Sequence, residues 1–138
     1  MADIHFIRNV LRSGFEIGEV DWVPWREPGR VGVEHHVLWA PDSAQGEDSA
    51  GLLLRFPPGA HGDYHEHLGY ELMLVLDGTL DHSDGASYTK GDLVVEAPGT
   101  EHQMSSRTGC TVLAIRTRPA AARTPRKPLR PVGLNAAS

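Results

Sequence analysis

The chain has 138 residues, of which 40% are hydrophobic and 22% charged, so it fits one soluble globular domain. It has no run of the about 18 consecutive apolar residues that a membrane-spanning helix needs. Its first residues also lack the basic and apolar regions of a secretory signal. The single cysteine, Cys110, excludes an internal disulfide and fits a reducing compartment. We therefore expect a cytoplasmic protein.

The charge is distributed unevenly along the chain. The net charge is −5, but residues 1–117 contain 8 basic and 18 acidic residues, a net of −10. The remaining basic residues form a tail without acidic residues: Arg118, Arg123, Arg126, Lys127 and Arg130. An acidic body disfavours nucleic-acid binding, so we expect neither a nucleic-acid nor a membrane partner. The basic tail either docks on the acidic body or stays disordered.

The predicted elements are short strands after an irregular start. Apolar residues at helical spacing between Ile4 and Leu11 allow a short helix within the segment 1–19. Strands are then expected at 20–25, 31–39, 51–56, 70–76, 79–82, 86–89, 92–97, 102–105 and 110–117. Asp77-Gly78 predicts a turn, and 83–85 predicts a hairpin.

The spacing of these strands indicates the fold class and the domain boundaries. Turn signals recur about every 8–12 residues and no helix-length segment separates the strands, which favours an all-β, antiparallel sandwich or barrel. The expected organisation is an N-terminal segment at 1–19, a β-barrel domain at 20–118 and a basic, Pro/Arg-rich flexible tail at 119–138.

Histidines and a carboxylate gather in the middle of the chain. His65 and His67 are two residues apart, so on a strand they share one face. The stretch 68–70 permits a bend that can turn Glu71 inward, and His102 can reach the same point from a neighbouring strand. Imidazoles and a carboxylate aimed at one point suit a metal ion. Spacing alone leaves a metal site and ordinary surface histidines equally open.

This segment resembles the first cupin motif, G-x5-H-x-H-x3,4-E-x6-G. Gly59, His65, His67, Glu71 and Gly78 match the motif with every spacing kept.

The second cupin motif, G-x5-P-x-G-x2-H-x3-N, is matched at Gly91, Gly99 and His102. The sequence departs from it at Ala97, where the motif has proline, and at Ser106, where it has asparagine. Neither departure removes a ligand. The resemblance implies a double-stranded β-helix, the cupin jelly-roll barrel, of six to eight strands. It also implies that the metal ligands are His65, His67, Glu71 and His102.

A narrower resemblance, over about 20–117, is to ChrR-like cupins. That group includes zinc-bearing sensory domains of anti-sigma factors, and it is similar to iron-dependent dioxygenases that cleave acetylacetone-type β-diketones and hydroxyacetophenones. The resemblance implies one divalent ion, with Fe²⁺ favoured over Zn²⁺, Ni²⁺ or Mn²⁺. The leading hypothesis is a dioxygenase of a small carbonyl or phenolic compound. The alternative is a sensory metal-binding domain without turnover. A metal-free sugar epimerase is disfavoured because all four ligand positions are filled.

Several further residues are candidates near the metal. Glu71 either remains a ligand or acts as a catalytic base. Met73 lies on its face by alternation and Met104 lies on the face of the last histidine, so both are expected to line a substrate pocket. Tyr70 and His36 are weaker candidates for the same pocket.

The opposite face of the central strand indicates an oligomer. Leu72, Leu74 and Leu76 point away from the predicted ligands, and an open two-sheet barrel has edge strands that need cover. We therefore expect a homodimer whose interface includes the strands at 20–25 and 31–39.

Overall fold

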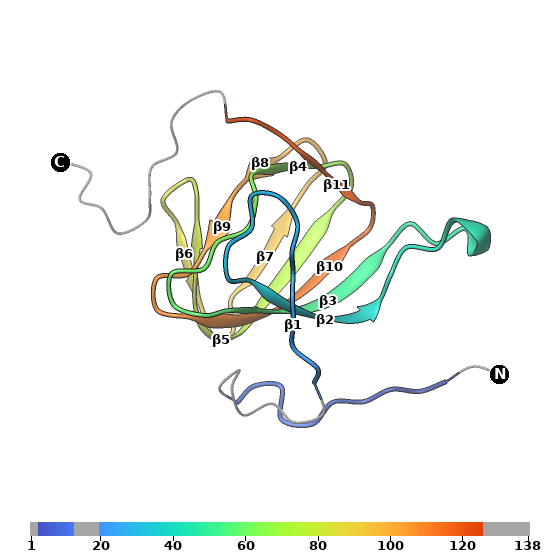
Figure 1. Cartoon of the computed structure of the whole chain (residues 1–138), viewed down its shortest axis with the longest axis horizontal. Coiled ribbons are helices and arrows are strands. Elements are labelled where there is room, and N and C mark those ends of the chain that lie inside the picture. Colours follow the sequence, from blue (N-terminus) through green and yellow to red (C-terminus); the bar gives the residue numbers. More distant parts are fainter. Residues whose placement is uncertain (1–2, 13–19, 126–138) are drawn as a thin grey trace.

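The computed structural model describes residues 3–12 and 20–125, and the strands of the second range form two curled antiparallel sheets (Figure 1). The strands are β1 (Val23–Pro24), β2 (Glu34–Trp39), β3 (Ala50–Phe56), β4 (His65–His67), β5 (Glu71–His82), β6 (Ser87–Thr89), β7 (Leu93–Glu96), β8 (Glu101–His102), β9 (Met104–Ser105), β10 (Cys110–Arg116) and β11 (Ala120–Ala122). The helical content of these residues is one 3₁₀ turn, η1 (Ser43–Gln45). None of their helices is long and apolar enough to cross a membrane. The predicted all-β jelly roll is confirmed.

The strands form one large and one small sheet. The large sheet has the order β1-β2-β3-β10-β5-β6, and the long strand β5 also pairs with β7 and β9. The small sheet has the order β11-β4-β8. In Figure 1 the small sheet lies at the top of the barrel, opposite β2 and β3 at the bottom. The interior between them is where inward-facing side chains of both sheets meet.

The core is apolar and is built by alternation along three adjacent strands. Its residues there are Leu52, Leu54 and Phe56 of β3, Met73 and Val75 of β5, and Val112 and Ala114 of β10. The register places Val112 beside both Leu54 and Val75, so the three strands contribute to the same layer. Each fully buried aliphatic side chain stabilises the fold by about 1.5 to 3 kcal/mol. The barrel is therefore held by packing that needs no ion.

The turn predicted at Asp77-Gly78 is wrong, because β5 runs through it. The β5–β10 register shifts between Thr111 and Val112, which is a β-bulge. Gly78 has φ +78, and a Cβ there would lie 2.1 Å from the carbonyl oxygen of Gly109. Only glycine fits this close approach. The bulge lets one strand bend from β7 and β10 toward β6 and β9, which close the barrel. The hairpin predicted at 83–85 is present between β5 and β6.

The N-terminal residues 3–12 form no helix and lie against the outer face of the large sheet. Residues 13–19 lie outside the described part of the chain. A shallow apolar pocket separates the segment from the sheet, lined by His5, Phe6, Ile7, Val10, Leu38, Leu53, Leu76 and Leu113. The Nζ of Lys90 donates to the carbonyl of Leu11 at 2.6 Å. The segment thus covers part of the apolar face that Leu76 presents.

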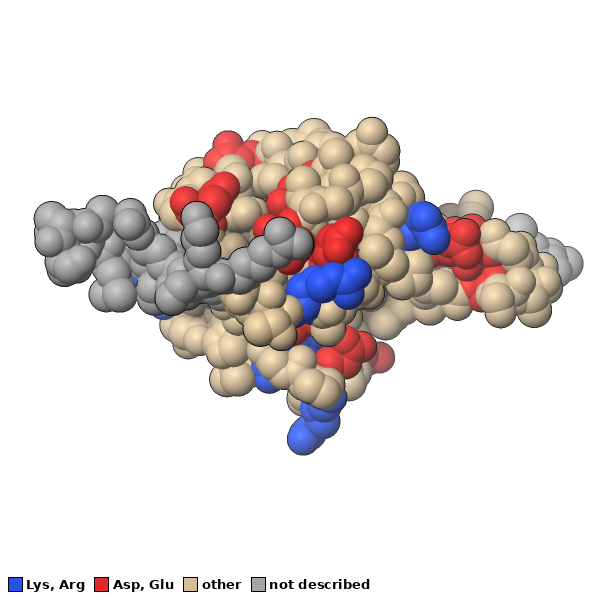
Figure 2. All heavy atoms as spheres, turned by 90° about the horizontal axis from the view of Figure 1, so that it is seen from above, with Lys and Arg blue, Asp and Glu red and all other residues tan. Residues whose placement is uncertain are grey.

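The first residues of the predicted tail pair with the barrel. In β11, Ala120 lies opposite His67 and Ala122 opposite His65. Arg123 then donates to Glu66 at 3.0 Å, and Figure 2 shows acidic side chains interspersed with a few basic ones on this side of the molecule. Docking of the basic segment on the acidic body is thus present up to 125, while 126–138 lie outside the described residues.

Candidate metal centre

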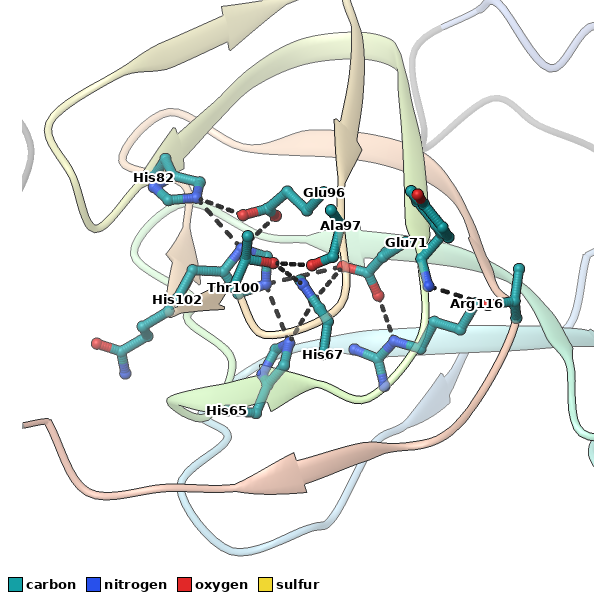
Figure 3. Close-up of polar contacts among 12 residues, drawn as sticks. His65, His67, Glu71, His82, Glu96, Ala97, Thr100, His102 and Arg116 are labelled. Carbon is teal, nitrogen blue, oxygen red and sulfur yellow. Dashed lines mark hydrogen bonds and ion pairs between the residues drawn. The ribbon is translucent and has the colours of Figure 1, made fainter.

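Four buried side chains meet inside the barrel beneath the small sheet. β4 carries His65 and His67, which share one face because they are two residues apart. Glu71 begins β5, and His102 ends β8. Each is at most 4% exposed. Figure 3 shows the three rings and the carboxylate pointing toward one another from these strands.

The ligating atoms of this cluster have the separations of a coordination shell. His65 Nε2 lies 3.2 Å from His67 Nε2 and 3.0 Å from His102 Nε2. Glu71 Oε1 lies 3.1 Å from His67 Nε2 and 3.7 Å from His102 Nε2. Two ligands that are each about 2.1 Å from one ion lie about 3.0 Å apart at a right angle and about 3.4 Å apart in a tetrahedron. The four residues could therefore hold one metal ion.

Two of the imidazole rings are oriented by hydrogen bonds on their other nitrogen. His65 Nδ1 lies 3.0 Å from the carbonyl oxygen of Asp63, which can only accept, so Nδ1 donates. His67 Nδ1 lies 2.9 Å from Thr100 Oγ1. That hydroxyl donates its own proton to the carbonyl of Ala97 at 2.7 Å, so it accepts from the ring. In both rings the proton sits on Nδ1 and the lone pair of Nε2 faces the cluster.

The third ring is held by a carboxylate. His102 Nδ1 lies 2.5 Å from Glu96 Oε2, and the other oxygen of Glu96 lies 3.1 Å from His82 Nε2. Burial alone would raise the pKa of Glu96, but its contacts with the two rings lower it to about 2. Burial lowers the pKa of His102 against the pull of Glu96, which keeps the ring neutral as a metal ligand must be. Carboxylate–histidine pairs of this kind fix ligand rings in metal sites.

The remaining oxygen of Glu71 is bound by an arginine. Arg116 lies directly opposite Glu71 in the β5–β10 register, and its Nε donates to Glu71 Oε2. Burial alone would raise the pKa of Glu71, but the charge of Arg116 and the contact with His67 hold it well below its ordinary value. The carboxylate is therefore ionised, with Oε1 directed at the rings.

The chemistry of this donor set fits a divalent cation. Three Nε2 lone pairs and one carboxylate oxygen converge in a buried space, and the cation beside them, Arg116, binds the other oxygen of Glu71. Lone pairs at such separations repel one another unless a proton or a cation lies between them. Because each Nδ1 already carries the ring proton, a metal ion satisfies all four atoms at once.

A small cavity of about 20 Å³ adjoins the cluster on its apolar side, enough for about one water molecule. Met73 and Met104 line it together with His65, Glu71 and His102.

Two weaker candidates are not brought to this cavity. Tyr70 is 55% exposed at the surface. His36 lies on β2, where its Nδ1 accepts from the backbone N–H of Asp21 at 3.3 Å.

Sequence analysis missed three polar residues that organise the site. Glu96 and Arg116 lie on strands whose alternate neighbours, Val94 and Ala114, are buried, so period-two alternation places both on the inward face. An inward charged residue in an apolar strand was the signal that could have found them. Thr100 follows the Pro98-Gly99 turn and carries no signal of this kind.

The fold is shared with solved structures at low identity. A chain of the Rhodobacter sphaeroides SigE complex with the anti-sigma ChrR aligns with 27% identity over 71% of this chain and 49% of that chain, with a TM-score of 0.57. An acetylacetone dioxygenase from Acinetobacter johnsonii aligns with 15% identity over 78% and 75%, with a TM-score of 0.67. A cupin-like protein of unknown function from Ralstonia eutropha JMP134 aligns with 20% identity over 67% and 59%, with a TM-score of 0.60. The chain spans less than two thirds of the first and the last of these.

The sequence itself gives the family. No curated protein matches it significantly. The family model of the ChrR cupin-like domain matches residues 12–120, which covers both motifs and nearly all described strands. The chain belongs to the ChrR cupin-like domain family.

Proposed function

We propose that the protein binds one divalent metal ion, preferentially Fe²⁺, and uses it as a dioxygenase of a small carbonyl or phenolic compound. The observation that carries the proposal is the convergence of three Nε2 atoms and Glu71 Oε1, in which each atom lies 3.0 to 3.7 Å from two of the others. Four protein ligands leave an octahedral ion with open positions. When bound there, the ion supplies Lewis acidity and, as iron, redox chemistry with oxygen.

The protein's own part in this reaction is to orient the ligand side chains, to keep Glu71 ionised and to limit the water beside them. Asp63, Thr100 and Glu96 hold the three rings in one tautomer, so each presents a lone pair without rearrangement. Arg116 keeps Glu71 ionised and holds one of its oxygens. This favours Glu71 as a fixed ligand over a base that leaves the metal. The small cavity beside the cluster is lined mostly by apolar side chains, which limits the water next to the centre.

The test is metal analysis of protein purified without oxygen, followed by oxygen-uptake assays with β-diketones and hydroxyaryl ketones. We expect uptake that requires iron and is abolished by His65→Ala. Glu71→Gln is expected to keep the fold while changing metal affinity and turnover. Uptake that persists without iron, or in the His65→Ala variant, would contradict the proposal.

A second candidate function is a sensory zinc-binding domain without turnover. It is favoured by the 27% identity to a chain of the SigE–ChrR complex. The same four residues suit zinc, which prefers imidazole and carboxylate ligands in a tetrahedron. Tightly held stoichiometric zinc, together with no oxygen uptake on any metal, would favour this function.

A further inference from the structure

A second pocket opens at the mouth of the barrel, next to the candidate metal centre. Its volume is about 300 Å³, at the lower end of the range for small-molecule sites. Arg30 and Arg116 line both this outer pocket and the small cavity beside His65 and Glu71. The two guanidinium groups therefore form the boundary between the outer pocket and the metal cluster.

Arg116 presents unused hydrogen-bond donors at this boundary. Its side chain is 14% exposed, and its Nε donates to Glu71. Within the described residues, no hydrogen bond or ion pair engages its two terminal nitrogens, and Figure 3 shows its contact with the carboxylate only through Nε. A guanidinium has five N–H groups in a planar fork, four of them on these terminal nitrogens. These terminal nitrogens are not among the fully buried atoms that lack a partner, so in the pocket they are available to an acceptor on a ligand.

Arg30 lies beside it and is also incompletely paired. Its side chain is 6% exposed, and its Nη2 lies 3.0 Å from Asp63 Oδ1. Its buried Nε lies 3.5 Å from Glu27 and has no hydrogen-bond partner among the described residues. Burial lowers the pKa of Arg30, Asp63 opposes this, and the charge of Arg116 lowers it further. The two guanidinium groups are thus close enough to repel each other electrostatically. An anion bound between them would offset this repulsion.

Two walls of the pocket carry flat indole rings, while Asp63, which pairs with Arg30, and Glu27 also line it. The Arg30 guanidinium stacks on the Trp25 ring at 3.4 Å from its centroid, which fixes both planes. Trp39 lines the pocket from β2, with its Nε1 donating to Ser49 at 2.9 Å. A Cβ at Gly51 would lie 2.3 Å from the Trp39 ring, so glycine allows the ring to lie against β3.

We propose that this outer pocket binds a small monocarboxylate with a flat apolar body, its carboxylate on Arg116 and Arg30 and its body between Trp25 and Trp39. The identification of this ligand as the substrate rests on the proposed metal-dependent reaction. The existence of the binding site does not depend on that reaction. Glu27 lies at the rim, with its side chain 57% exposed, and repels a second acidic group. A monoanion is therefore preferred over a dianion.

The test is calorimetry and tryptophan fluorescence on the full-length protein, as purified and after treatment with a chelator. The probes are benzoate, its neutral analogue benzamide and the dianion phthalate. We expect benzoate to bind at least about tenfold more tightly than benzamide, as hydrogen bonds between charged groups imply, and more tightly than phthalate. Equal affinity for benzoate and benzamide, or binding of neither, would overturn the proposal, and this comparison needs no variant.

Variants then locate the site. Arg116→Gln is expected to lower benzoate affinity about tenfold or more and to leave benzamide nearly unchanged. Gly51→Ala should displace Trp39 and weaken both probes by a similar factor. The matched control is Arg123→Gln, which removes the same charge from the residue that follows β11, outside the pocket lining, where Arg123 pairs with Glu66. Benzoate binding that survives Arg116→Gln, or that falls equally in Arg123→Gln, would refute the assignment.

The result is separable from the proposed function. Selective benzoate binding to chelator-treated protein, together with no oxygen uptake with any metal, would support the carboxylate site and contradict the dioxygenase proposal. Iron-dependent oxygen uptake without selective benzoate binding would support the dioxygenase proposal and contradict the carboxylate site.

Discussion

His65 and His102 are direct partners in the β4–β8 ladder, and their Nε2 atoms lie 3.0 Å apart. They are 37 positions apart in the sequence. Backbone pairing thus sets the spacing of these two rings, and packing of the apolar core holds the strands that carry them. The site is therefore built by the fold, unlike a zinc finger, in which the metal builds the fold.

The first prediction follows from this order of assembly. His67→Ala and His102→Ala, singly or together, should lose most bound metal while circular dichroism and a cooperative melt show a folded barrel. The melting temperature falls modestly, because remaining buried ligands lose their partner. His36→Ala is the matched control. Because His36 lies outside the cluster, this variant should keep the metal content of the wild-type protein. Stoichiometric metal in the double variant would disprove the ligand assignment.

The second prediction concerns the carboxylate behind His102. Glu96→Gln removes the acceptor charge that orients the ring, so metal affinity should fall about 10- to 100-fold without loss of fold. Competition with a chromophoric chelator measures this directly. Glu101→Gln is the control, because Glu101 adjoins His102 on β8 but makes no contact with the cluster. Equal losses in both variants would show that Glu96 has no special role.

The third prediction uses the buried thiol. Burial raises the pKa of Cys110 from its ordinary 9.0 to about 12, and the side chain is 6% exposed. Because the folded pKa is raised, the thiol's contribution to stability is complete below pH 9 and is lost as pH rises toward about 12. A disulfide reagent at pH 8 should therefore label native protein only as fast as it unfolds, and label denatured protein at once. Rapid stoichiometric labelling of folded protein would contradict this.

The fourth prediction separates two parts of the tail. Deleting 119–138 removes β11 and the Arg123–Glu66 pair, so it should lower the melting temperature and weaken metal retention. Deleting only 126–138 keeps both and should behave like the full chain in the same melts and metal assays. Identical behaviour of the two truncations would mean that β11 contributes nothing.

The fifth prediction is a homodimer, which we propose from the exposed strands near the start of the barrel. β1 is at the edge of the large sheet, and Val23 and Val31 are exposed apolar side chains of this region that line neither the outer pocket nor the pocket under the N-terminal segment. Burying such a patch favours association. Sedimentation velocity at micromolar concentration should show a dimer, and Val31→Asp should shift it to monomer. A wild-type monomer would refute the proposal.

Alternation and turn signals predicted most of the strands and placed His65 and His67 on one face, because both signals are local to a single strand. Glu71 and His102 were expected at the same point through the resemblance to the cupin motifs. Pairing between strands was harder to foresee. The strand expected at 20–25 shrinks to Val23–Pro24, where Pro24 has no N–H to continue the ladder. Asp77-Gly78 has the composition of a turn, yet both residues pair with β10, and β5 continues through them. The roles of Glu96 and Arg116 depend on what lies across from them, which one strand cannot reveal.

The pairing of β11 with β4 moves the edge of the small sheet away from the strand that carries two cluster histidines. β4 carries two of the cluster histidines, and β8 covers only one of its edges. Without β11 the other edge would offer free N–H and C=O groups to any extended chain, the usual route to sheet-mediated aggregation. The three alanines of β11 are small and uncharged, and they contribute backbone more than side chain. β11 is itself the edge strand of the small sheet, but it has only three residues, and a short edge pairs less readily with another chain. We therefore expect the solubility of a shortened form to depend on whether it still includes Ala120–Ala122.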